Sequence, residues 1–283
     1  MLVMGKGGVG KTTIAASLAV LGAEANGKAV LVEFGDGEAG KRALAGSQRN
    51  VEHVIIRPSE ALQRGAAPLF GSATLARIVL GNFAMRPLLG AAPAIRELAM
   101  LESVRQLVAE RPGVRVVVDM PATGHSVAWL RVPRQGRDLL GSGPLFEMCD
   151  RIARELCTPR HASIVVVTLP ERLVIEETIE LCAAVGADTG LEVDRIVVNR
   201  MPVSLPRAAL DDARALASRR GALADAAAAL ASVLDAREAA QAEALGSLGA
   251  LVHDNHTIWR IPLAPIDPSA REVAGWLRAE GAQ

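Results

Sequence analysis

A glycine-rich run near the start of the chain constrains the fold more than any other feature. Residues 5–13 have the sequence GKGGVGKTT, which fits the phosphate-binding loop pattern G-x-x-x-x-G-K-[ST]. Glycine permits positive φ and lets the backbone approach a phosphate with no Cβ in the way, so that successive N–H groups can face one anion. A helix that begins near Lys11 would add its unpaired N–H groups and its positive dipole end. The run therefore predicts a nucleoside triphosphate site.

Single positions of this loop predict single contacts. Lys11 should contact the β- and γ-phosphates, and the Thr12 hydroxyl should bind Mg²⁺. Lys6 is an additional cation directly after the first glycine, and we expect it to reach a phosphate bound by a neighbouring subunit. Both lysines are predicted to act in catalysis; the alternative is a glycine-rich turn without a ligand. The predicted nucleotide contacts in the loop are Gly5, Lys6, Gly7, Gly8, Val9, Gly10, Lys11, Thr12 and Thr13.

The sequence on either side of the loop predicts a strand before it and a helix after it. Residues 2–4 are apolar but make a very short strand, and residues 13–21 are rich in the helix-favouring alanine and leucine. Because the strand is so short, we expect the natural N-terminus to lie a few residues upstream. We expect no signal peptide, since the nucleotide loop already occupies the first residues.

Short β-rich runs alternate with helical segments along the rest of the chain. Most of these runs are nearly continuous in apolar residues, as expected for strands of a parallel sheet that is covered on both faces. The alternation predicts an α/β fold with a doubly wound, mostly parallel sheet, in a single P-loop ATPase domain over residues 1–283. The predicted strands are 29–34, 114–118, 163–168 and 195–198, with a weaker one at 257–261.

Two stretches are too long to be simple connections between strands. Residues 57–111 contain several helical segments broken by prolines, and residues 134–158 add further helix. We expect these two stretches to form an inserted helical subdomain at one edge of the sheet. Residues 206–249 are rich in alanine and predict a long helix that is exposed, faces a partner or is partly mobile.

Composition excludes several classes of protein. Lysine plus arginine and aspartate plus glutamate balance at 31 each, which argues against nucleic acid or an anionic membrane as a partner bound through bulk charge. The three cysteines form no CxxC pair, and this favours a reducing cytoplasm over a disulfide framework or a zinc site. No apolar run reaches the roughly 18 residues that span a bilayer. We therefore expect a cytoplasmic protein with no integral membrane segment.

Acidic residues follow two of the predicted strands. Asp119 directly follows one strand, where a Mg²⁺ ligand belongs beside a phosphate loop, here acting through a bound water. Asp36 follows another, near the expected γ-phosphate, where a carboxylate can activate the attacking water and contact the metal through water. A helix cap is the alternative for Asp119, and a solvated turn for Asp36. Glu33 and Glu38 are weaker candidates for the same catalytic task.

These motifs together resemble the deviant Walker A ATPases of the family that contains arsenical pump-driving (anion-transporting) ATPases and tail-anchored-protein-targeting ATPases. That family carries the loop GKGGVGKTT, which is unbroken at residues 5–13. Its second switch has the sequence DTAPTGH and is followed by a proline; residues 119–125 have DMPATGH here, and Pro133 follows. Further similar segments are 167–171, 176–178 and 197–200.

The resemblance implies bound ATP and Mg²⁺ and a role for each charged residue. Lys6 would contact phosphates across a dimer interface, while Lys11 and Thr12 would hold phosphate and Mg²⁺ within the subunit. Asp36 would be the first-switch aspartate that activates water, and Asp119 the Mg²⁺-linked aspartate of the second switch. The family's first switch usually has the sequence D-P-A-H, whereas residues 36–39 have DGEA. Without the proline and the histidine, we expect hydrolysis to be slow or differently gated.

A third strand end predicts the adenine contact. Asn199 follows strand 195–198, and its amide offers a donor and an acceptor that match the edge of adenine. A strand-end turn is the alternative for this asparagine. The resemblance implies the same contact and adds Pro262 and Leu263 as residues that pack near the base.

The combined prediction is a Mg²⁺-dependent ATPase that works as a nucleotide-gated dimer, with a second copy or a related ATPase as the other subunit. Its output would be a conformational change delivered to a protein client or to a membrane-associated partner. One alternative is a weakly active or non-catalytic ATP-binding subunit of a heterodimer. Another is a partitioning or positioning ATPase on DNA or membrane, which the balanced charge argues against. A small client groove or ordinary helix packing would account for Met85, Leu88, Leu89, Met100, Leu101, Phe146 and Met148.

Overall fold

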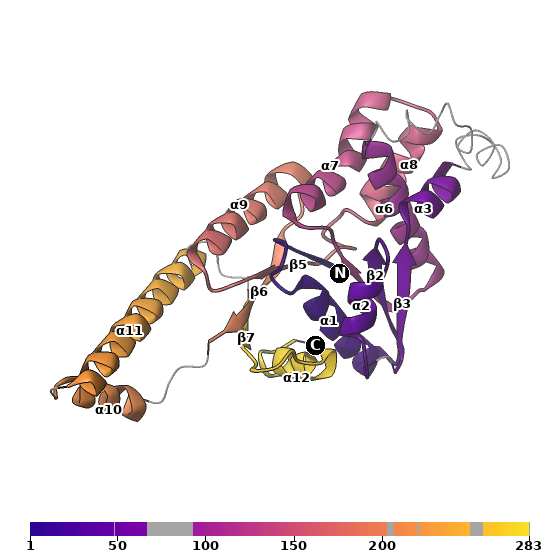
Figure 1. The fold of residues 1–283 in the computed structure, drawn as a ribbon. Coiled ribbons are helices and arrows are strands. Elements are labelled where there is room, and N and C mark those ends of the chain that lie inside the picture. Colours follow the sequence, from indigo (N-terminus) through magenta and orange to yellow (C-terminus); the bar gives the residue numbers. More distant parts are fainter. Residues whose placement is uncertain (48, 67–92, 203–206, 220, 250–256, 283) are drawn as a thin grey trace.

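The fold is known from a computed structural model, which describes residues 1–47, 49–66, 93–202, 207–219, 221–249 and 257–282. Within these residues a seven-stranded sheet has the order β3-β2-β4-β1-β5-β6-β7, and every pair of neighbouring strands is parallel. Helices cover both faces of the sheet (Figure 1), so the predicted doubly wound α/β fold is confirmed. The strands are β1 (Leu2–Gly5), β2 (Ala29–Phe34), β3 (Val51–Ile56), β4 (Arg115–Asp119), β5 (Ile164–Thr168), β6 (Val193–Met201) and β7 (Thr257–Pro262).

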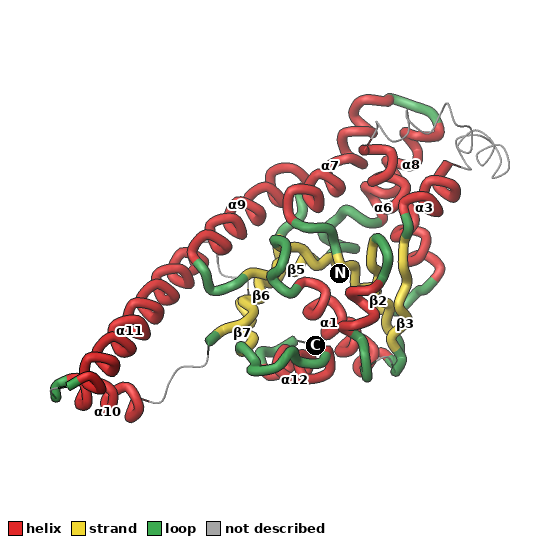
Figure 2. Tube along the Cα trace, viewed as in Figure 1, coloured by secondary structure: helices red, strands yellow, loops and turns green. Residues whose placement is uncertain are grey.

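The helices alternate with the strands along the chain, as the tube in Figure 2 shows. They are α1 (Lys11–Asn26), α2 (Glu38–Ala43), α3 (Pro58–Ala66), α6 (Pro93–Glu110), α7 (Thr123–Leu140), α8 (Pro144–Glu155), α9 (Arg172–Thr189), α10 (Arg207–Ala217), α11 (Ala222–Gly249) and α12 (Ala270–Ala279). Among the described residues, no helix combines the length and the apolar character that crossing a bilayer requires.

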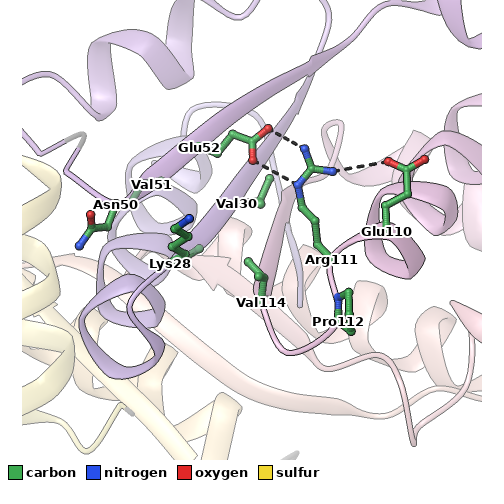
Figure 3. Close-up of a pocket in the computed structure, with 10 residues that line it drawn as sticks. Lys28, Val30, Asn50, Val51, Glu52, Glu110, Arg111, Pro112 and Val114 are labelled. Atoms are coloured by element: carbon green, nitrogen blue, oxygen red, sulfur yellow. Dashed lines mark hydrogen bonds and ion pairs between the residues drawn. The ribbon is translucent and has the colours of Figure 1, made fainter.

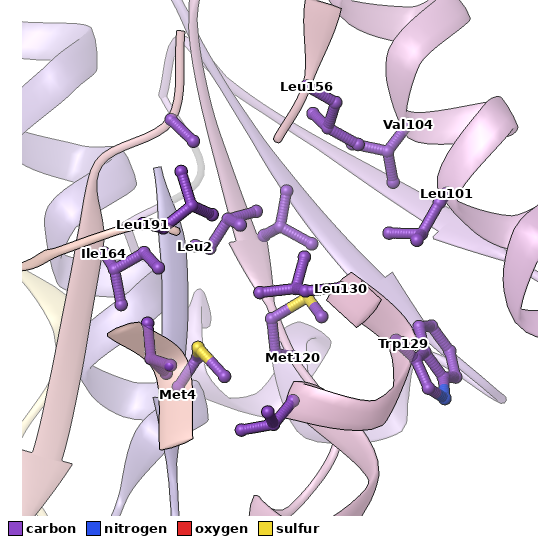
Figure 4. Close-up of a cluster of buried hydrophobic side chains, with 14 of the residues drawn as sticks. Leu2, Met4, Leu101, Val104, Met120, Trp129, Leu130, Leu156, Ile164 and Leu191 are labelled. Atoms are coloured by element: carbon purple, nitrogen blue, oxygen red, sulfur yellow. The ribbon is translucent and has the colours of Figure 1, made fainter. Parts of the chain in front are cut away.

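Each strand supplies side chains to two separate cores. Val3, Leu31 and Val117 lie on the face that α1 and α12 cover. Their chain neighbours, such as Leu2 and Val30, lie on the opposite face under α6, α7, α8 and α9. Figure 4 shows part of this second core, around β1 and α7. Because successive side chains of a strand point to opposite faces, a sheet covered on both sides needs apolar residues at nearly every position.

The strand order places β1 between β4 and β5 at the centre of the sheet. After β1 the chain passes through α1 to β2 on one side, whereas after β4 it crosses to β5 on the other side. Ligands of open α/β sheets bind at the carboxyl ends of the strands where such a reversal occurs. The loop that follows β1 therefore begins at the place where the topology favours a binding site.

Two elements beside the site were absent from the sequence-based prediction. β3 has the sequence VEHVII and forms the edge strand next to β2, and α2 has only six residues. An edge strand tolerates polar residues such as Glu52 and His53, so β3 lacks the apolar run by which the other strands were found. The weaker strand prediction at 257–261 is confirmed as β7.

Helices α3, α6, α7 and α8 gather at one end of the molecule, at the upper right of Figure 1. Met100, Leu101 and Met148, which were candidates for a client groove, are at most 4 % exposed and belong to the core. The groove interpretation is therefore wrong for these three residues, because their side chains hold the helices together. Met85, Leu88 and Leu89 lie outside the described residues.

The alanine-rich segment forms two antiparallel helices, α10 and α11, that extend away from the sheet (Figure 1). Ala244 and Leu248 near the end of α11 are buried in the core that α9 also enters. Towards its start, α11 carries Leu223, Leu230 and Val233, which are more than half exposed. The prediction of a long helical segment is thus confirmed.

Candidate nucleotide-binding site

The loop between β1 and α1 has the backbone that a phosphate site needs. Gly5 has φ of 147°, and a Cβ there would lie 2.3 Å from the carbonyl oxygen of Val167 in β5. Gly10 has φ of 92°, and a Cβ there would lie 2.4 Å from the side-chain nitrogen of Asn199. Val9 is 1 % exposed and anchors the loop in the core. Only glycine fits the two ends of the loop, so its course is set by close contact with β5 and β6.

Helix α1 opens directly onto this loop. Its N-cap is Gly10, which has no side chain to occupy the first free N–H groups of the helix. Lys11 Nζ donates a hydrogen bond to the carbonyl oxygen of Lys6 at 2.9 Å. Burial lowers the pKa of Lys11, and the charge of Asp119 opposes this effect. An ammonium that has lost part of its water beside free amide donors is suited to bind an anion.

Asp119 at the end of β4 and Thr12 at the start of α1 meet beside Lys11. The Thr12 hydroxyl donates to Asp119 Oδ2 at 2.6 Å. Asp119 Oδ1 is buried and has no hydrogen-bond partner among the described residues. Burial raises the pKa of Asp119 to about 6, against the lowering effects of the Thr12 hydrogen bond and the Lys11 charge. Neighbouring Glu33 adds to the rise through its negative charge.

These two residues fit a magnesium ion that arrives with a nucleotide. Mg²⁺ usually keeps several waters and binds through one or two protein oxygens together with substrate phosphates. The Thr12 hydroxyl can serve as the protein ligand, and the unpaired Asp119 Oδ1 can accept from a metal-bound water. The structure thus brings together two of the three sequence-predicted metal residues, Thr12 and Asp119, which lie 107 positions apart.

The predicted base contacts share one cavity with the loop. Asn199, Pro262 and Leu263 line a pocket of about 630 Å³ together with Gly10 and Thr12. The Asn199 amide nitrogen donates to the Val9 carbonyl at 2.9 Å, and its oxygen accepts from the Arg200 backbone N–H at 2.9 Å. One amide hydrogen and one lone pair remain for a ligand. In this structure Asn199 therefore also holds the phosphate loop, a role that its sequence position did not reveal.

Four charged residues of this cavity were not among the predicted site residues. They are Arg42 on α2, Arg200 on β6, Asp267 in the loop after β7, and Glu272 in α12. Glu272 and Ser269 form a capping box at the start of α12, a spacing that the sequence does signal. The position of Arg42 depends on α2, which the apolar pattern did not predict.

Asp36 lies at the carboxyl edge of the sheet, but its side chain faces solvent. Its Oδ1 accepts from the Glu38 backbone N–H at 3.0 Å and so closes a turn before α2. This conformation matches the solvated turn that was the alternative to a catalytic role for Asp36. Gly35 and Gly37 on either side have φ of 114° and 80°, so the segment bends at residues with high backbone freedom.

The Lys6 side chain forms an ion pair with an acidic residue of its own chain. Its Nζ lies 2.6 Å from Glu177 Oε1 on α9, and the two side chains are 42 % and 45 % exposed. Sequence analysis included Glu177 only within a segment similar to the ATPase family. The contact joins residues 171 positions apart and could not be inferred from local pattern.

A second cavity, of about 550 Å³, lies at the opposite edge of the sheet (Figure 3). Its lining includes Lys28, Asn50 and Val114, which stand at or before the starts of β2, β3 and β4. Arg111 crosses it with hydrogen bonds of 2.7 and 3.1 Å to Glu52. Because this cavity is at the amino ends of the strands, it is separate from the phosphate loop.

Asp119→Asn is expected to stabilise the nucleotide-free protein at pH 7 while removing turnover. A carboxyl group whose pKa is raised by folding favours the folded state below its unfolded pKa, near 3.8. That contribution is lost as the pH rises through about 6. At pH 7 the ionised, buried Asp119 carboxylate therefore lowers the free energy of unfolding by roughly 2–3 kcal/mol. Asparagine carries no charge and can still accept from Thr12. In urea denaturation, the free energies of unfolding of the wild type and Asp119→Asn should differ little at pH 4 and clearly at pH 7. A difference that stays the same at both pH values would contradict this prediction.

Together, the parallel sheet, the glycine loop at its switch point and the Lys11–Thr12–Asp119 cluster define a P-loop nucleotide-binding protein. Residues 1–238 match the model of the CbiA family, described as the CobQ/CobB/MinD/ParA nucleotide-binding domain. The chain belongs to this family. The predicted P-loop nucleotide-binding domain is thereby confirmed, whereas ATP hydrolysis and the arsenical pump-driving branch stay predictions.

Two proteins similar to this chain come from mycobacteria. ATPase BagA of Mycobacterium tuberculosis (strain H37Rv) is 28 % identical over 220 residues, which cover 70 % of this chain and 64 % of that protein. The same figures apply to a protein of Mycobacterium bovis whose name also refers to an ATPase. The chain thus matches less than two thirds of the length of these relatives.

Proposed function

We propose that the chain is a cytoplasmic, Mg²⁺-dependent ATPase of the deviant Walker A branch that contains the arsenical pump-driving and tail-anchored-protein-targeting ATPases. In this proposal ATP joins two subunits, either identical or related, and hydrolysis releases them. The resulting change of shape is delivered to a protein client or a membrane-associated partner. The exposed apolar side chains of α11 offer a surface that such a partner could contact.

One observation carries the dimer proposal: the two loop lysines face different surroundings. Lys11 is partly buried beside Asp119 and can serve the phosphates of its own subunit. Lys6 is half exposed, and within the part of the chain that the structure describes its ammonium group is held only by Glu177. An exposed ion pair contributes about 0–1 kcal/mol, so a phosphate presented by a second subunit can replace Glu177 at little cost.

The chemical role that we assign to each residue follows from its position relative to the phosphate loop. The loop amides and Lys11 would hold the phosphates, and Thr12 and Asp119 would hold the metal, which when bound neutralises charge on the phosphates. Asp36 would turn from its solvated position towards the attacking water and accept its proton. The glycines beside Asp36 permit that movement.

The test is whether ATP makes the protein dimerise and whether the dimer is the active form. Light scattering during size-exclusion chromatography should show a monomer without nucleotide and a dimer with ATP and Mg²⁺. Turnover per subunit should rise with protein concentration, since only paired subunits hydrolyse. A constant turnover per subunit from a monomeric protein would reject the dimer, and absence of turnover even with a related subunit would reject the ATPase.

Glu177→Gln is expected to strengthen ATP-dependent dimerisation. The change removes the charge that competes for Lys6, and a symmetric dimer contains two such pairs. At under 1 kcal/mol for each pair, the dimer dissociation constant should fall about fivefold. Sedimentation equilibrium with ATP measures it, and Glu176→Gln is the control because Glu176 pairs with Arg172. A weaker dimer in Glu177→Gln would mean that Glu177 supports the interface.

A further inference from the structure

A buried acid, Glu33, lies on β2 next to the metal-binding residues. It is 7 % exposed, and the β2–β4 register pairs it directly with Asp119. A buried carboxylate needs hydrogen-bond donors to offset its lost hydration. The structure supplies two of them from different elements.

Both donors reach the same oxygen of Glu33. The Gly40 backbone N–H donates to Oε2 at 2.8 Å, and His53 Nε2 on β3 lies 3.0 Å from it. Gly40 belongs to the first turn of α2, where backbone N–H groups have no partner inside the helix. Glu33 therefore caps α2 from the neighbouring strand, and His53 orients the cap.

The fit between α2 and this pair is too close for any side chain. A Cβ on Gly40 would lie 2.4 Å from Glu33 Oε2 and 2.6 Å from His53 Nε2. A Cβ on Gly37 would lie 2.2 Å from a side-chain carbon of Ile55. The backbone of α2 thus rests directly on β2 and β3.

We propose that Glu33, oriented by His53, is a positioning residue that anchors α2 while Asp36 leaves its turn to reach the reaction centre. This proposal rests on the proposed function. Asp36 and Glu33 each accept one backbone hydrogen bond at the start of α2. Asp36 accepts from the Glu38 N–H, and Glu33 accepts from the Gly40 N–H. When Asp36 turns, the first bond breaks and the second remains. Two glycines flank Asp36, so the anchor and not the loop supplies the stiffness.

The test compares Glu33→Ala with Glu33→Gln. Alanine removes the anchor, and a displacement of about 1 Å at a reacting group can cost on the order of 100-fold in rate, so kcat should fall about 10- to 100-fold. The KM for ATP should stay within about threefold, because Lys11 and Thr12 are unchanged. The carboxamide oxygen of glutamine can take the place of Oε2 and accept from both the Gly40 N–H and His53 Nε2–H, so Glu33→Gln should restore most of kcat. Glu52→Ala, on β3 but paired with Arg111 away from the site, is the control.

Hydrogen exchange of the segment 36–43 gives a readout that does not depend on turnover. Exchange should be faster in Glu33→Ala and close to that of the wild type in Glu33→Gln. If the proposed ATPase function fails, this contrast still decides whether the anchor exists. If Glu33→Ala does not fold, His53→Ala should show the same pattern more weakly, with rescue by His53→Gln.

Two results would overturn the proposal. Equal loss of kcat in the alanine and glutamine variants would mean that the Glu33 charge acts on the reaction itself, as a base or through the metal. An unchanged kcat in Glu33→Ala, with only a lower melting temperature, would mean that Glu33 serves packing alone.

Discussion

Lys6→Ala is expected to abolish ATP-dependent dimerisation and to lower turnover by about 10³-fold, the lower range for a cation supplied to a transferring phosphoryl group by a second subunit. The affinity of the monomer for ATP should stay within about threefold of the wild type. The physical reason is the separation of the two lysines: Lys11 is partly buried beside Asp119, whereas Lys6 is exposed and bound to Glu177. Removing Lys6 leaves the phosphate site of its own subunit intact.

Three measurements on one protein preparation check this result: nucleotide affinity by titration, mass by light scattering, and turnover by phosphate release. Lys28→Ala is the matched control, because Lys28 is also an exposed lysine but lies before β2 at the opposite edge of the sheet. Normal turnover of Lys6→Ala would remove the cross-subunit role. Loss of ATP affinity equal to that of Lys11→Ala would place Lys6 in the site of its own subunit.

Asp36→Asn is expected to bind ATP and to dimerise, but to hydrolyse ATP about 10²- to 10⁴-fold more slowly, as for loss of a general base. The asparagine oxygen can still accept from the Glu38 N–H, the 3.0 Å bond that closes the turn in the wild type. The loop should therefore keep its shape, while the side chain can no longer take a proton from water. The dimer should persist for as long as ATP stays uncleaved.

Single-turnover hydrolysis and dimer lifetime measure this effect, and Glu52→Gln serves as the control, because Glu52 on β3 pairs with Arg111 away from the site. Unchanged hydrolysis in Asp36→Asn would reassign water activation, with Glu33 as the next carboxylate along β2. Loss of dimerisation together with hydrolysis would indicate instead that Asp36 acts in assembly. A persistent ATP-bound dimer would also be a suitable form in which to look for the client.

Much of the fold could be predicted from the sequence because it follows from local pattern. The apolar runs at 29–34 and 164–168 are strands because a sheet covered on both faces needs apolar residues at nearly every position. β3 and α2 were not predicted, because neither has a clear local pattern of apolar residues. β3 is an edge strand with Glu52 and His53 in it, and α2 is six residues long, too short to show a helical period.

Some residues of the candidate site could likewise be predicted from the sequence, whereas other contacts could not. Lys11, Thr12 and Asp119 could be named from the sequence, because a glycine loop after one strand and an acid after another meet at the same edge of a parallel sheet. The residues that bind the Lys6 and Asn199 side chains could not be named from the sequence. Lys6 pairs with Glu177 across 171 positions, and Asn199 holds the Val9 carbonyl across 190.

The sequence by itself determined that this chain has a phosphate loop, a parallel α/β sheet and an aspartate beside the loop, since all three depend on the spacing of near neighbours. Only the tertiary structure decided that Lys6 is held by Glu177 and that Glu33 and His53 fasten α2. These contacts depend on the strand order β3-β2-β4-β1-β5-β6-β7. Continuous apolar runs specify which residues form the buried strands, but they carry no record of which strands become neighbours.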